Sequence, residues 1–253
     1  MTTNEGTANG PEGPRVAIVT GGSGGIGRAS ARRLAADGMA VAVHYAGGRE
    51  QAERTVEAIT GAGGRAVAVG ADIGDEAAVE ELFDRTEQEF GGVDVVVNTA
   101  GIMLLAPVAE MSPDDFDRMH RTNVRGTFLV ARQAARRLRR GGALITFSST
   151  VTRLQQPGYG AYAASKGAVE AMTLVLAREL RGRDITVNTI APGPTATPLF
   201  LQDKPPELIE RIAGMSPMGR LGEPEDIAES VAFLAGPARW VNGQVLYANG
   251  GVA

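Results

Sequence analysis

Short apolar runs alternate with longer amphipathic stretches along most of this chain. The runs contain few polar positions, which is typical of parallel strands that are covered on both faces. They occupy residues 15–20, 39–45, 65–70, 93–98, 143–149, 184–190 and 243–248. Because helical patterns separate them, we predict an α/β fold with one doubly wound parallel sheet of about seven strands and right-handed crossovers.

Several helical stretches carry end signals. The stretch 75–91 opens with acidic residues and closes at Gly91, a residue suited to a helix C-terminus. A Ser-Pro-x-Asp start signal at 112–115 predicts a helix that runs towards Arg140. Four arginines between positions 136 and 140 suit the dipole at the end of that helix, and this explanation is favoured over a nucleic-acid surface.

No change of composition divides the chain, so we expect a single domain over residues 14–253. Residues 1–13 are polar and rich in Gly and Pro, which predicts a disordered tail. The segment 194–220 is rich in proline and holds a short helical pattern, ELIERI. Because it follows a strand end late in the chain, we expect it to form a lid over a ligand crevice.

Composition excludes several kinds of site. The 253 residues carry a net charge of −4 and no cysteine, so disulfides and thiolate chemistry are absent. The two histidines, His44 and His120, lack ligand spacing, and we predict no metal site. There is no basic block for nucleic acid and no apolar run of the roughly 18 residues that a membrane span needs. We therefore expect a soluble, cytoplasmic protein with neither nucleic acid nor membrane as a partner.

A glycine-rich turn follows the first predicted strand directly. Gly22, Gly24 and Gly27 match G-x-G-x-x-G, and the same string also matches T-G-x-x-x-G-x-G from Thr20 to Gly27. Glycines let the backbone approach a pyrophosphate, and the helix N-terminus that follows adds partial positive charge. A tight turn without a ligand is the alternative. The position between first strand and first helix favours dinucleotide binding and a Rossmann fold.

Tyr162 and Lys166 are four residues apart in a predicted helix, so their side chains share one face. An ammonium beside the phenol would lower the ordinary tyrosine pKa of about 10, and Tyr162 could then exchange a proton with a carbonyl or alcohol oxygen. An exposed surface pair is the alternative. Against it, Lys166 is one of only two lysines among 25 basic residues, and Tyr159 has no lysine at its own i+4 position.

These motifs occur with others in a set order: TGGSGGIG, NTAG (98–101), Ser149, AYAASK (161–166) and NTIAPG (188–193). Together they resemble the short-chain dehydrogenase/reductase family over residues 14–251, and in particular its 3-oxoacyl-[acyl-carrier-protein] reductase-like members. The resemblance implies that Tyr162 is the acid/base, that Lys166 binds the nicotinamide ribose, and that Ser149 hydrogen-bonds the substrate carbonyl. Asn123 would position a water that feeds a proton relay to the lysine; a polar residue that kinks a helix is the alternative.

The resemblance also implies a cofactor site. Its residues would be Gly21, Ser23, Gly25, Ile26, Gly27, Tyr45, Arg49, Asp72, Ile73, Asn98, Ala100, Gly101, Tyr162, Lys166, Pro192, Gly193, Thr195 and Thr197. No acidic residue precedes Glu50 after the second strand, where members selective for NAD place an acid. Arg49, with His44 and Tyr45 nearby, is a plausible partner for a 2′-phosphate. NADP(H) is therefore favoured and NAD(H) remains possible, since Gly24 stands where some NADP-preferring members carry a basic residue.

Residues after the strand ends should form the substrate pocket. They are Met103, Leu104, Leu105, Leu154, Gln155, Gln156, Tyr159, Leu199 and Phe200. Their mostly apolar character suggests a ketone or secondary alcohol with apolar parts, hence a carbonyl reductase. For several of them, packing of the lid alone is the alternative.

Two alternative functions remain open. The first is reduction of a carrier-bound 3-oxoacyl group, because Arg140 and Arg183 fall where such reductases carry basic residues for the acidic carrier. The second is a cofactor-binding sensor or scaffold without turnover, which the intact Asn-Ser-Tyr-Lys set disfavours. Family members of this kind usually assemble as homotetramers, and the same assembly is expected here.

Overall fold

The computed structural model describes residues 13–202 and 204–253, so most of the predicted N-terminal tail lies outside the described residues. The described strands form one parallel sheet in the order β3-β2-β1-β4-β5-β6-β7, which confirms the predicted doubly wound sheet. Their bounds are β1 (Val16–Thr20), β2 (Ala40–Tyr45), β3 (Arg65–Gly70), β4 (Val93–Asn98), β5 (Leu138–Phe147), β6 (Thr186–Pro192) and β7 (Val245–Ala248).

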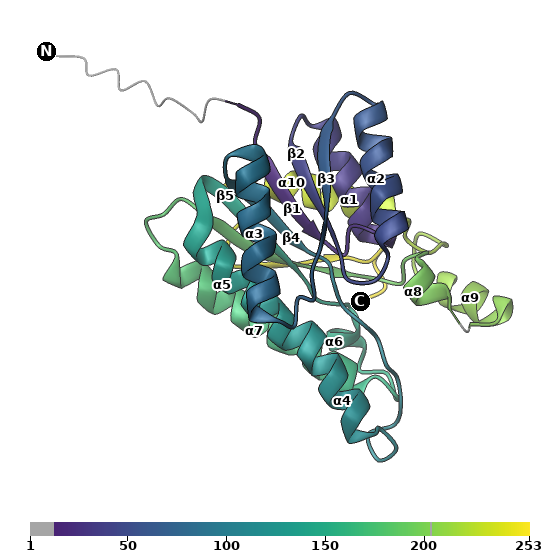
Figure 1. Cartoon of the computed structure of the whole chain (residues 1–253). Coiled ribbons are helices and arrows are strands. Elements are labelled where there is room, and N and C mark those ends of the chain that lie inside the picture. Colours follow the sequence, from purple (N-terminus) through teal and green to yellow (C-terminus); the bar gives the residue numbers. More distant parts are fainter. Residues whose placement is uncertain (1–12, 203) are drawn as a thin grey trace, which may run out of the picture.

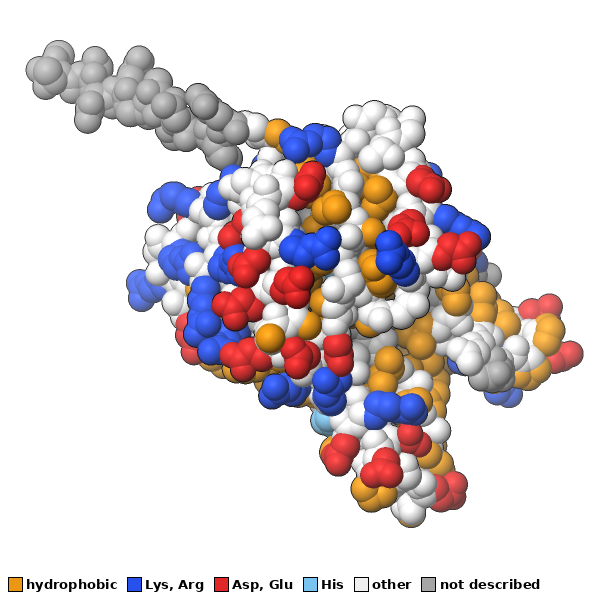
Figure 2. All heavy atoms as spheres, in the orientation of Figure 1, with side chains coloured by type: hydrophobic (Ala, Val, Ile, Leu, Met, Phe, Trp, Pro, Cys, Tyr) orange, Lys and Arg blue, Asp and Glu red, His pale blue; other side chains and the backbone are white. Residues whose placement is uncertain are grey.

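Helices cover both faces of the sheet (Figure 1). On one face lie α1 (Gly25–Ala36), α2 (Arg49–Gly61) and α10 (Pro224–Ala235), and on the other lie α3 (Glu76–Phe90), α5 (Thr127–Arg137) and α7 (Gly160–Glu179). Each layer buries its apolar stripe against the valine-rich strands, and burial of that surface is the main stabilising contribution. On the outer surface, acidic and basic side chains are interspersed over α3 and α5 (Figure 2).

The region between β4 and β5 departs from the sequence prediction of one helix from Ser112 to Arg140. Ser112 does cap α4 (Pro113–His120), since its hydroxyl accepts a hydrogen bond from the backbone N–H of Asp115 at 3.1 Å. A π-helical turn, η1 (Arg121–Gly126), then separates α4 from α5. The chain leaves the helix after Arg137, so Arg139 and Arg140 belong to β5 rather than to a helix end.

Ion pairing explains this boundary. Arg139 forms a bidentate pair with the buried carboxylate of Asp94, at the start of the neighbouring strand β4, and this draws the segment into the sheet. The expectation that all four arginines complement a helix dipole was therefore wrong for Arg139 and Arg140. Arg137 also pairs across to α3, with Asp84 and Glu87.

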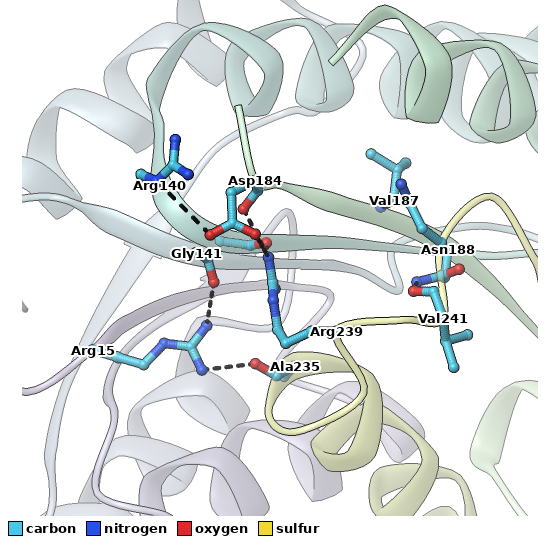
Figure 3. Close-up of polar contacts among 11 residues, drawn as sticks. Arg15, Arg140, Gly141, Asp184, Val187, Asn188, Ala235, Arg239 and Val241 are labelled. Carbon is cyan, nitrogen blue, oxygen red and sulfur yellow. Dashed lines mark hydrogen bonds and ion pairs between the residues drawn. The ribbon is translucent and has the colours of Figure 1, made fainter. Parts of the chain in front are cut away.

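Charged side chains tie together the amino-terminal edge of the sheet (Figure 3). The guanidinium of Arg15 donates to the carbonyl of Ala235 at 2.7 Å and to that of Gly141 at 3.4 Å. Arg239 donates to the carboxylate and carbonyl of Asp184, whose backbone has a positive φ of 54°. These contacts fasten loops at the end of the sheet opposite to the carboxyl ends of the strands.

The carboxyl edge is open by comparison. Strand order reverses direction between β1 and β4, and in doubly wound sheets a ligand crevice forms outside such a switch point. The remaining helices, α4, α6 (Val151–Leu154), α8 (Pro198–Leu201) and α9 (Pro206–Ala213), lie around this edge, and α8 and α9 project from the body (Figure 1).

Candidate active site

A cavity of about 1030 Å³ lies at the carboxyl edge of the sheet. It is lined by the ends of β5 and β6, by the start of α7 and by the segment that holds α8 and α9. Ser149, Tyr162 and Lys166 share this cavity with Ile26 of the glycine-rich turn. Residues far apart in the sequence thus meet where the topology predicts a ligand.

Helix α7 presents Tyr162 and Lys166 on one face, as the spacing predicted. The hydroxyl of Ser149, which follows β5, hydrogen-bonds with the Tyr162 phenol. The Lys166 ammonium lies 5.7 Å from the centroid of the Tyr162 ring and donates to the carbonyl of Phe147 at 3.0 Å. The three side chains therefore form one cluster at the wall of the cavity.

Burial dominates the protonation of this cluster. It raises the pKa of Tyr162 to about 12, although the Ser149 hydrogen bond acts in the opposite direction. It also lowers the pKa of Lys166 to about 8. The sequence had predicted a lowered tyrosine pKa. The opposite direction follows because desolvation disfavours the phenolate and the ammonium is held by the Phe147 carbonyl. At neutral pH Tyr162 is a neutral phenol, the form that donates a proton.

Asn123 lies in η1 and is buried behind this cluster rather than on the cavity wall. Its amide oxygen accepts from the N–H of Ile102 at 2.9 Å, and its amide nitrogen donates to the Ile102 carbonyl and to the Ser165 hydroxyl. The side chain therefore clamps the segment after β4 to α7. A Cβ at Gly101 would lie 3.1 Å from the Asn123 oxygen and 3.4 Å from the Lys166 nitrogen, so Gly101 lies against both side chains and a larger residue would have to displace the Asn123 amide by a few tenths of an ångström.

The glycine-rich turn has the shape that a phosphate cradle requires. Gly21 has a φ of +67°, and a Cβ at Gly27 would lie 2.3 Å from the Gly21 carbonyl oxygen. Helix α1 starts at Gly25 with its first N–H groups free of side-chain caps. A pyrophosphate fits this arrangement, because close backbone approach and an uncapped helix N-terminus both favour it.

The residues predicted near the adenosine ribose, Asn98 and Ala100, are not on the cavity wall. Asn98 is buried, with its amide bonded to the hydroxyls of Thr20 and Thr127, so it shapes the turn between β4 and the cavity. The backbone N–H of Ala100, two residues further along, donates a hydrogen bond to the Thr20 hydroxyl at 3.2 Å. The side chains of Asn98 and Thr20 thus support the backbone at this point and do not face the cavity.

After β3, Asp72 and Ile73 were predicted to hold the adenine. Asp72 forms an ion pair with Arg121 at 2.8 Å, which together with the N–H of Gly74 keeps the pKa of this carboxyl below its ordinary value. The Ile73 side chain is buried in the core. Any contact of Ile73 with a cofactor therefore has to come from its backbone.

The region predicted to hold a 2′-phosphate lies at the start of α2. A Cβ built on Gly48 would be 3.3 Å from the Ser23 hydroxyl, so the glycine-rich turn and the start of α2 adjoin. Arg49 is exposed beside them and pairs with Glu53 at 2.7 Å. Tyr45 packs its ring on Gly70, at the end of β3. His44, expected nearby as well, is instead buried beneath the turn.

The loop after β6 links the cofactor and lid regions. Pro192, Gly193, Thr195 and Thr197 all line the cavity, as predicted. The Thr197 hydroxyl caps α8 by accepting from the N–H of Phe200 at 3.2 Å. A parallel bridge between Thr195 and Gly222 joins the two ends of the predicted lid, so the segment between them leaves the body and returns at one point.

Most predicted substrate residues line the cavity. They are Met103, Leu154, Gln156, Tyr159, Leu199 and Phe200. Leu104, Leu105 and Gln155 do not, and Gln155 ends α6 with a positive φ of 51°. Sequence reasoning missed Ile212, Met215 and Val252, which come from α9, the loop behind it and the C-terminus. No periodic signal connects those positions to the strand ends.

Glu170 was also missed. It lies four residues after Lys166, and one of its carboxylate oxygens accepts from the hydroxyls of Ser148 at 2.5 Å and Thr152 at 3.0 Å. These two residues flank Ser149, so Glu170 fixes the segment that carries the active-site hydroxyl. The i, i+4, i+8 spacing of Tyr162, Lys166 and Glu170 is the signal that could have indicated it.

Comparison with known proteins agrees with this geometry. The family model described as enoyl-(acyl carrier protein) reductase matches residues 21–253. A chloroplastic NADPH-dependent aldehyde reductase-like protein of Arabidopsis thaliana is 46% identical over 94% of this chain and 93% of its own. Versicolorin reductase stcU of Emericella nidulans is 40% identical over 94% and 95%. The crystal structure of angucycline C-6 ketoreductase LanV with bound NADP has a TM-score of 0.89 at 40% identity, over 94% of this chain and 95% of that one.

Fold, cavity and sequence similarity lead to one classification. The chain belongs to the short-chain dehydrogenase/reductase family, as the ordered motifs indicated. Among the described residues, no group of three or more His, Asp or Glu side chains could hold a metal ion, and no helix there is long and apolar enough to cross a membrane.

Proposed function

We propose that this protein is an NADPH-dependent carbonyl reductase that converts a ketone or aldehyde with apolar substituents into an alcohol. The observation that carries the proposal is the cluster of Ser149, Tyr162 and Lys166 at the wall of a largely apolar cavity, next to the glycine-rich turn. The relatives described above, named as aldehyde reductase, versicolorin reductase and ketoreductase, support the same reaction type.

The residues of the chain supply binding and proton transfer. Bound NADPH supplies the hydride that adds to the carbonyl carbon. Ser149 and Tyr162 hydrogen-bond the carbonyl oxygen, and the phenol proton passes from Tyr162 to that oxygen as the alcohol forms. Lys166 binds the nicotinamide ribose, and its charge stabilises the phenolate that remains. Asn123 holds the segment after β4 against α7 beside Lys166, and a water at this place would return a proton through Lys166.

The choice of NADP(H) over NAD(H) rests on the end of β2. No carboxylate lies between His44 and Arg49 to repel a 2′-phosphate, and Ser23 lies against Gly48, the residue before Arg49. The NADP-bound structure at 40% identity supports this preference. The substrate class rests on Met103, Leu154 and Phe200, which line the cavity without charge, and on segment 194–220 acting as the lid.

A carrier-bound 3-oxoacyl group is the weaker alternative. Arg183 donates to the carbonyls of Ala135 and Leu138, so its guanidinium already serves the fold. Arg140 faces Asp184 at the amino-terminal edge of the sheet, away from the cavity (Figure 3). Neither arginine is placed to guide a carrier to the cavity of its own subunit.

We also propose that the protein assembles as a homotetramer and is located in the cytoplasm. Phe128 on α5 and Val175 on α7 expose about half of their surface, at 50% and 56%, and Leu174 exposes 43%. An apolar surface of this kind on two long helices is suited to pairing with a second copy. Light scattering on purified protein tests the mass of the assembly.

Oxidation of NADPH, with NADH in parallel, tests the reaction against aldehydes, diketones, quinones, polycyclic aryl ketones and 3-oxoacyl thioesters. Turnover of a ketone or aldehyde that prefers NADPH and is lost in Tyr162→Phe is expected. Tight NADPH binding with no turnover of any carbonyl would contradict the proposal and favour a cofactor-binding sensor. Turnover of thioesters alone would favour the carrier-bound substrate.

A further inference from the structure

His44 lies at the end of β2, directly beneath the glycine-rich turn, and is only 1% exposed. Its ring Nδ1 is 3.2 Å from the backbone nitrogen of Gly21, and its Nε2 is 2.9 Å from the carbonyl oxygen of Ala71. The Gly21 N–H can only donate and the Ala71 oxygen can only accept. The two contacts therefore define a single state of the ring: neutral, with the proton on Nε2 and a lone pair on Nδ1.

These contacts join two parts of the cofactor site. Gly21 is the first residue of the turn that would cradle the pyrophosphate, and it needs its positive φ of 67° to do so. Ala71 immediately precedes Asp72, on the side where the adenine is expected. The backbone of His44 adds to the link, because its carbonyl accepts from the N–H of Gly22 at 2.9 Å. One imidazole thus spans from the phosphate cradle to the end of β3.

We propose that His44 is a positioning residue for NADPH: its neutral ring holds the glycine-rich turn in the shape that binds the pyrophosphate, and protonation of the ring releases the turn. A protonated ring carries an N–H at both nitrogens, so Nδ1 would face the Gly21 N–H donor to donor. The inference rests on the proposed location of the cofactor at residues 21–27, and it assigns His44 no contact with the 2′-phosphate.

The groups around the ring set the direction of the pH effect. Residues 18–27, on the β1 side, contain no titratable side chain. On the β3 side Asp72 favours the charged ring, but that carboxylate is itself paired with Arg121. The next acids along the chain are Asp75, which caps α3 by accepting from the N–H of Ala78, and Glu76, which pairs with Arg132.

At the N-terminus of α2, Arg49 pairs with Glu53. Burial outweighs the influence of Asp72 and lowers the pKa of His44 below its ordinary value of 6.5. The ring is therefore neutral at pH 7, and NADPH affinity should fall as acid protonates it.

Two variants separate the two ring contacts. His44→Asn retains an acceptor near the position of Nδ1 and cannot be protonated, so it keeps the contact with Gly21. His44→Gln offers a donor towards Ala71 but no acceptor for Gly21. We expect His44→Asn to bind NADPH within about threefold of the natural protein at pH 8, and His44→Gln to bind about tenfold more weakly, the effect of roughly 1.4 kcal/mol expected for one lost hydrogen bond.

The experiment measures NADPH dissociation constants by fluorescence titration from pH 8 to pH 5, with thermal unfolding at each pH to confirm a folded protein. Affinity should fall more steeply with acid in the natural protein than in His44→Asn. The 2′-phosphate and Asp72 titrate in both proteins. The ratio of the NADPH dissociation constants of the natural protein and His44→Asn at each pH therefore reports only the protonation of the His44 ring. A constant ratio across the whole range, or tight binding by His44→Gln, would overturn the inference.

A direct readout of the ring completes the test. The chain has only two histidines, so ¹⁵N-histidine labelling yields two sets of ring signals, and His44→Asn assigns them. We expect the Nε2–H form for His44 at pH 7, and an Nδ1–H form would contradict the proposal. Absence of NADPH binding by the natural protein at every pH would instead contradict the proposed function, so the two failures are distinguishable.

Discussion

The two edges of the same sheet use polar side chains in opposite ways. At the amino-terminal edge, charges are paired and fasten loops: Arg139 with Asp94, and Arg239 with Asp184. At the carboxyl edge, Tyr162 and Lys166 line a cavity with no carboxylate partner among the described residues, and both have shifted pKa values. Polar groups that satisfy one another contribute to stability, whereas titratable groups kept desolvated at a cavity wall remain available for chemistry.

Tyr162→Phe gives the largest expected effect at the carboxyl edge. Loss of the proton donor should lower kcat by about 10³-fold, within the range for general acid catalysis. The phenyl ring keeps its packing, so NADPH affinity and thermal stability should change little. Steady-state kinetics beside a cofactor titration tests this, and a variant with near-normal kcat would show that the proton comes from another group.

Asp94→Ala gives the largest expected effect at the amino-terminal edge. The buried carboxylate accepts from the N–H of Val16 at 2.7 Å and from the Arg139 guanidinium. Its removal leaves these donors unpaired and should lower the free energy of unfolding by about 3 kcal/mol. Urea denaturation measures this loss. Glu57→Gln, at an exposed position of α2, is the control and should change stability by no more than about 0.5 kcal/mol.

Asp94→Ala also tests whether the two edges are independent. Because the Asp94 pair lies far from the cavity, kcat/KM measured at low temperature on the folded fraction should stay near normal. A large fall in kcat/KM without a change in the unfolding midpoint would show that the two edges are not independent.

Reduction and oxidation should depend differently on pH, and this is the next largest expected effect. Reduction needs protonated Tyr162, and a pKa of about 12 keeps this form present throughout the neutral range. Oxidation needs the phenolate, whose fraction rises about tenfold per pH unit below that pKa. We expect kcat/KM for alcohol oxidation to rise by up to about 100-fold from pH 7 to pH 9. Reduction should stay nearly flat at neutral pH and fall as Lys166, with a pKa of about 8, loses the charge that stabilises the phenolate. A flat oxidation profile would indicate that bound cofactor lowers this pKa.

Glu170→Ala tests the link between structure and chemistry at the carboxyl edge. Without the carboxylate, the hydroxyls of Ser148 and Thr152 lose their shared acceptor and Ser149 becomes less well positioned. We expect kcat to fall about tenfold, as for one lost hydrogen bond of roughly 1.4 kcal/mol, with the KM for NADPH unchanged. Glu170→Gln retains the accepting oxygen and should restore most of kcat; equal loss in both variants would favour a role for the negative charge.

Arg49→Asp gives the smallest expected effect, because the side chain is exposed to solvent. A carboxylate beside Ser23 would repel a 2′-phosphate, so the KM for NADPH should rise about fivefold while that for NADH changes less, as expected for a screened surface charge. Parallel kinetics with both cofactors at low salt measures this. An equal loss for both would remove Arg49 from the phosphate site.

Much of this architecture is readable in the sequence because its signals are local. The valine-rich runs predicted the strands, with bounds correct at β3 and β4, and the i, i+4 spacing placed Tyr162 and Lys166 on one face. The helix from Ser112 to Arg140 was predicted wrongly, because the Arg139–Asp94 pair that ends it joins positions 45 residues apart. His44, placed near a phosphate by sequence proximity, is buried because β3 packs alongside β2.

The sequence by itself determined the doubly wound sheet, the glycine-rich turn and the Tyr-Lys pair, because periodicity, spacing and backbone conformation act over a few residues. Ser149 was predicted from the resemblance to the family. Only the tertiary structure decided the protonation of the site. Desolvation of Tyr162 and Lys166 depends on Phe147, Ser149 and the segment 194–220, which approach from distant parts of the chain. Desolvation depends on all the segments that surround a side chain. The direction of the Tyr162 pKa shift therefore follows from the tertiary structure and not from the local sequence.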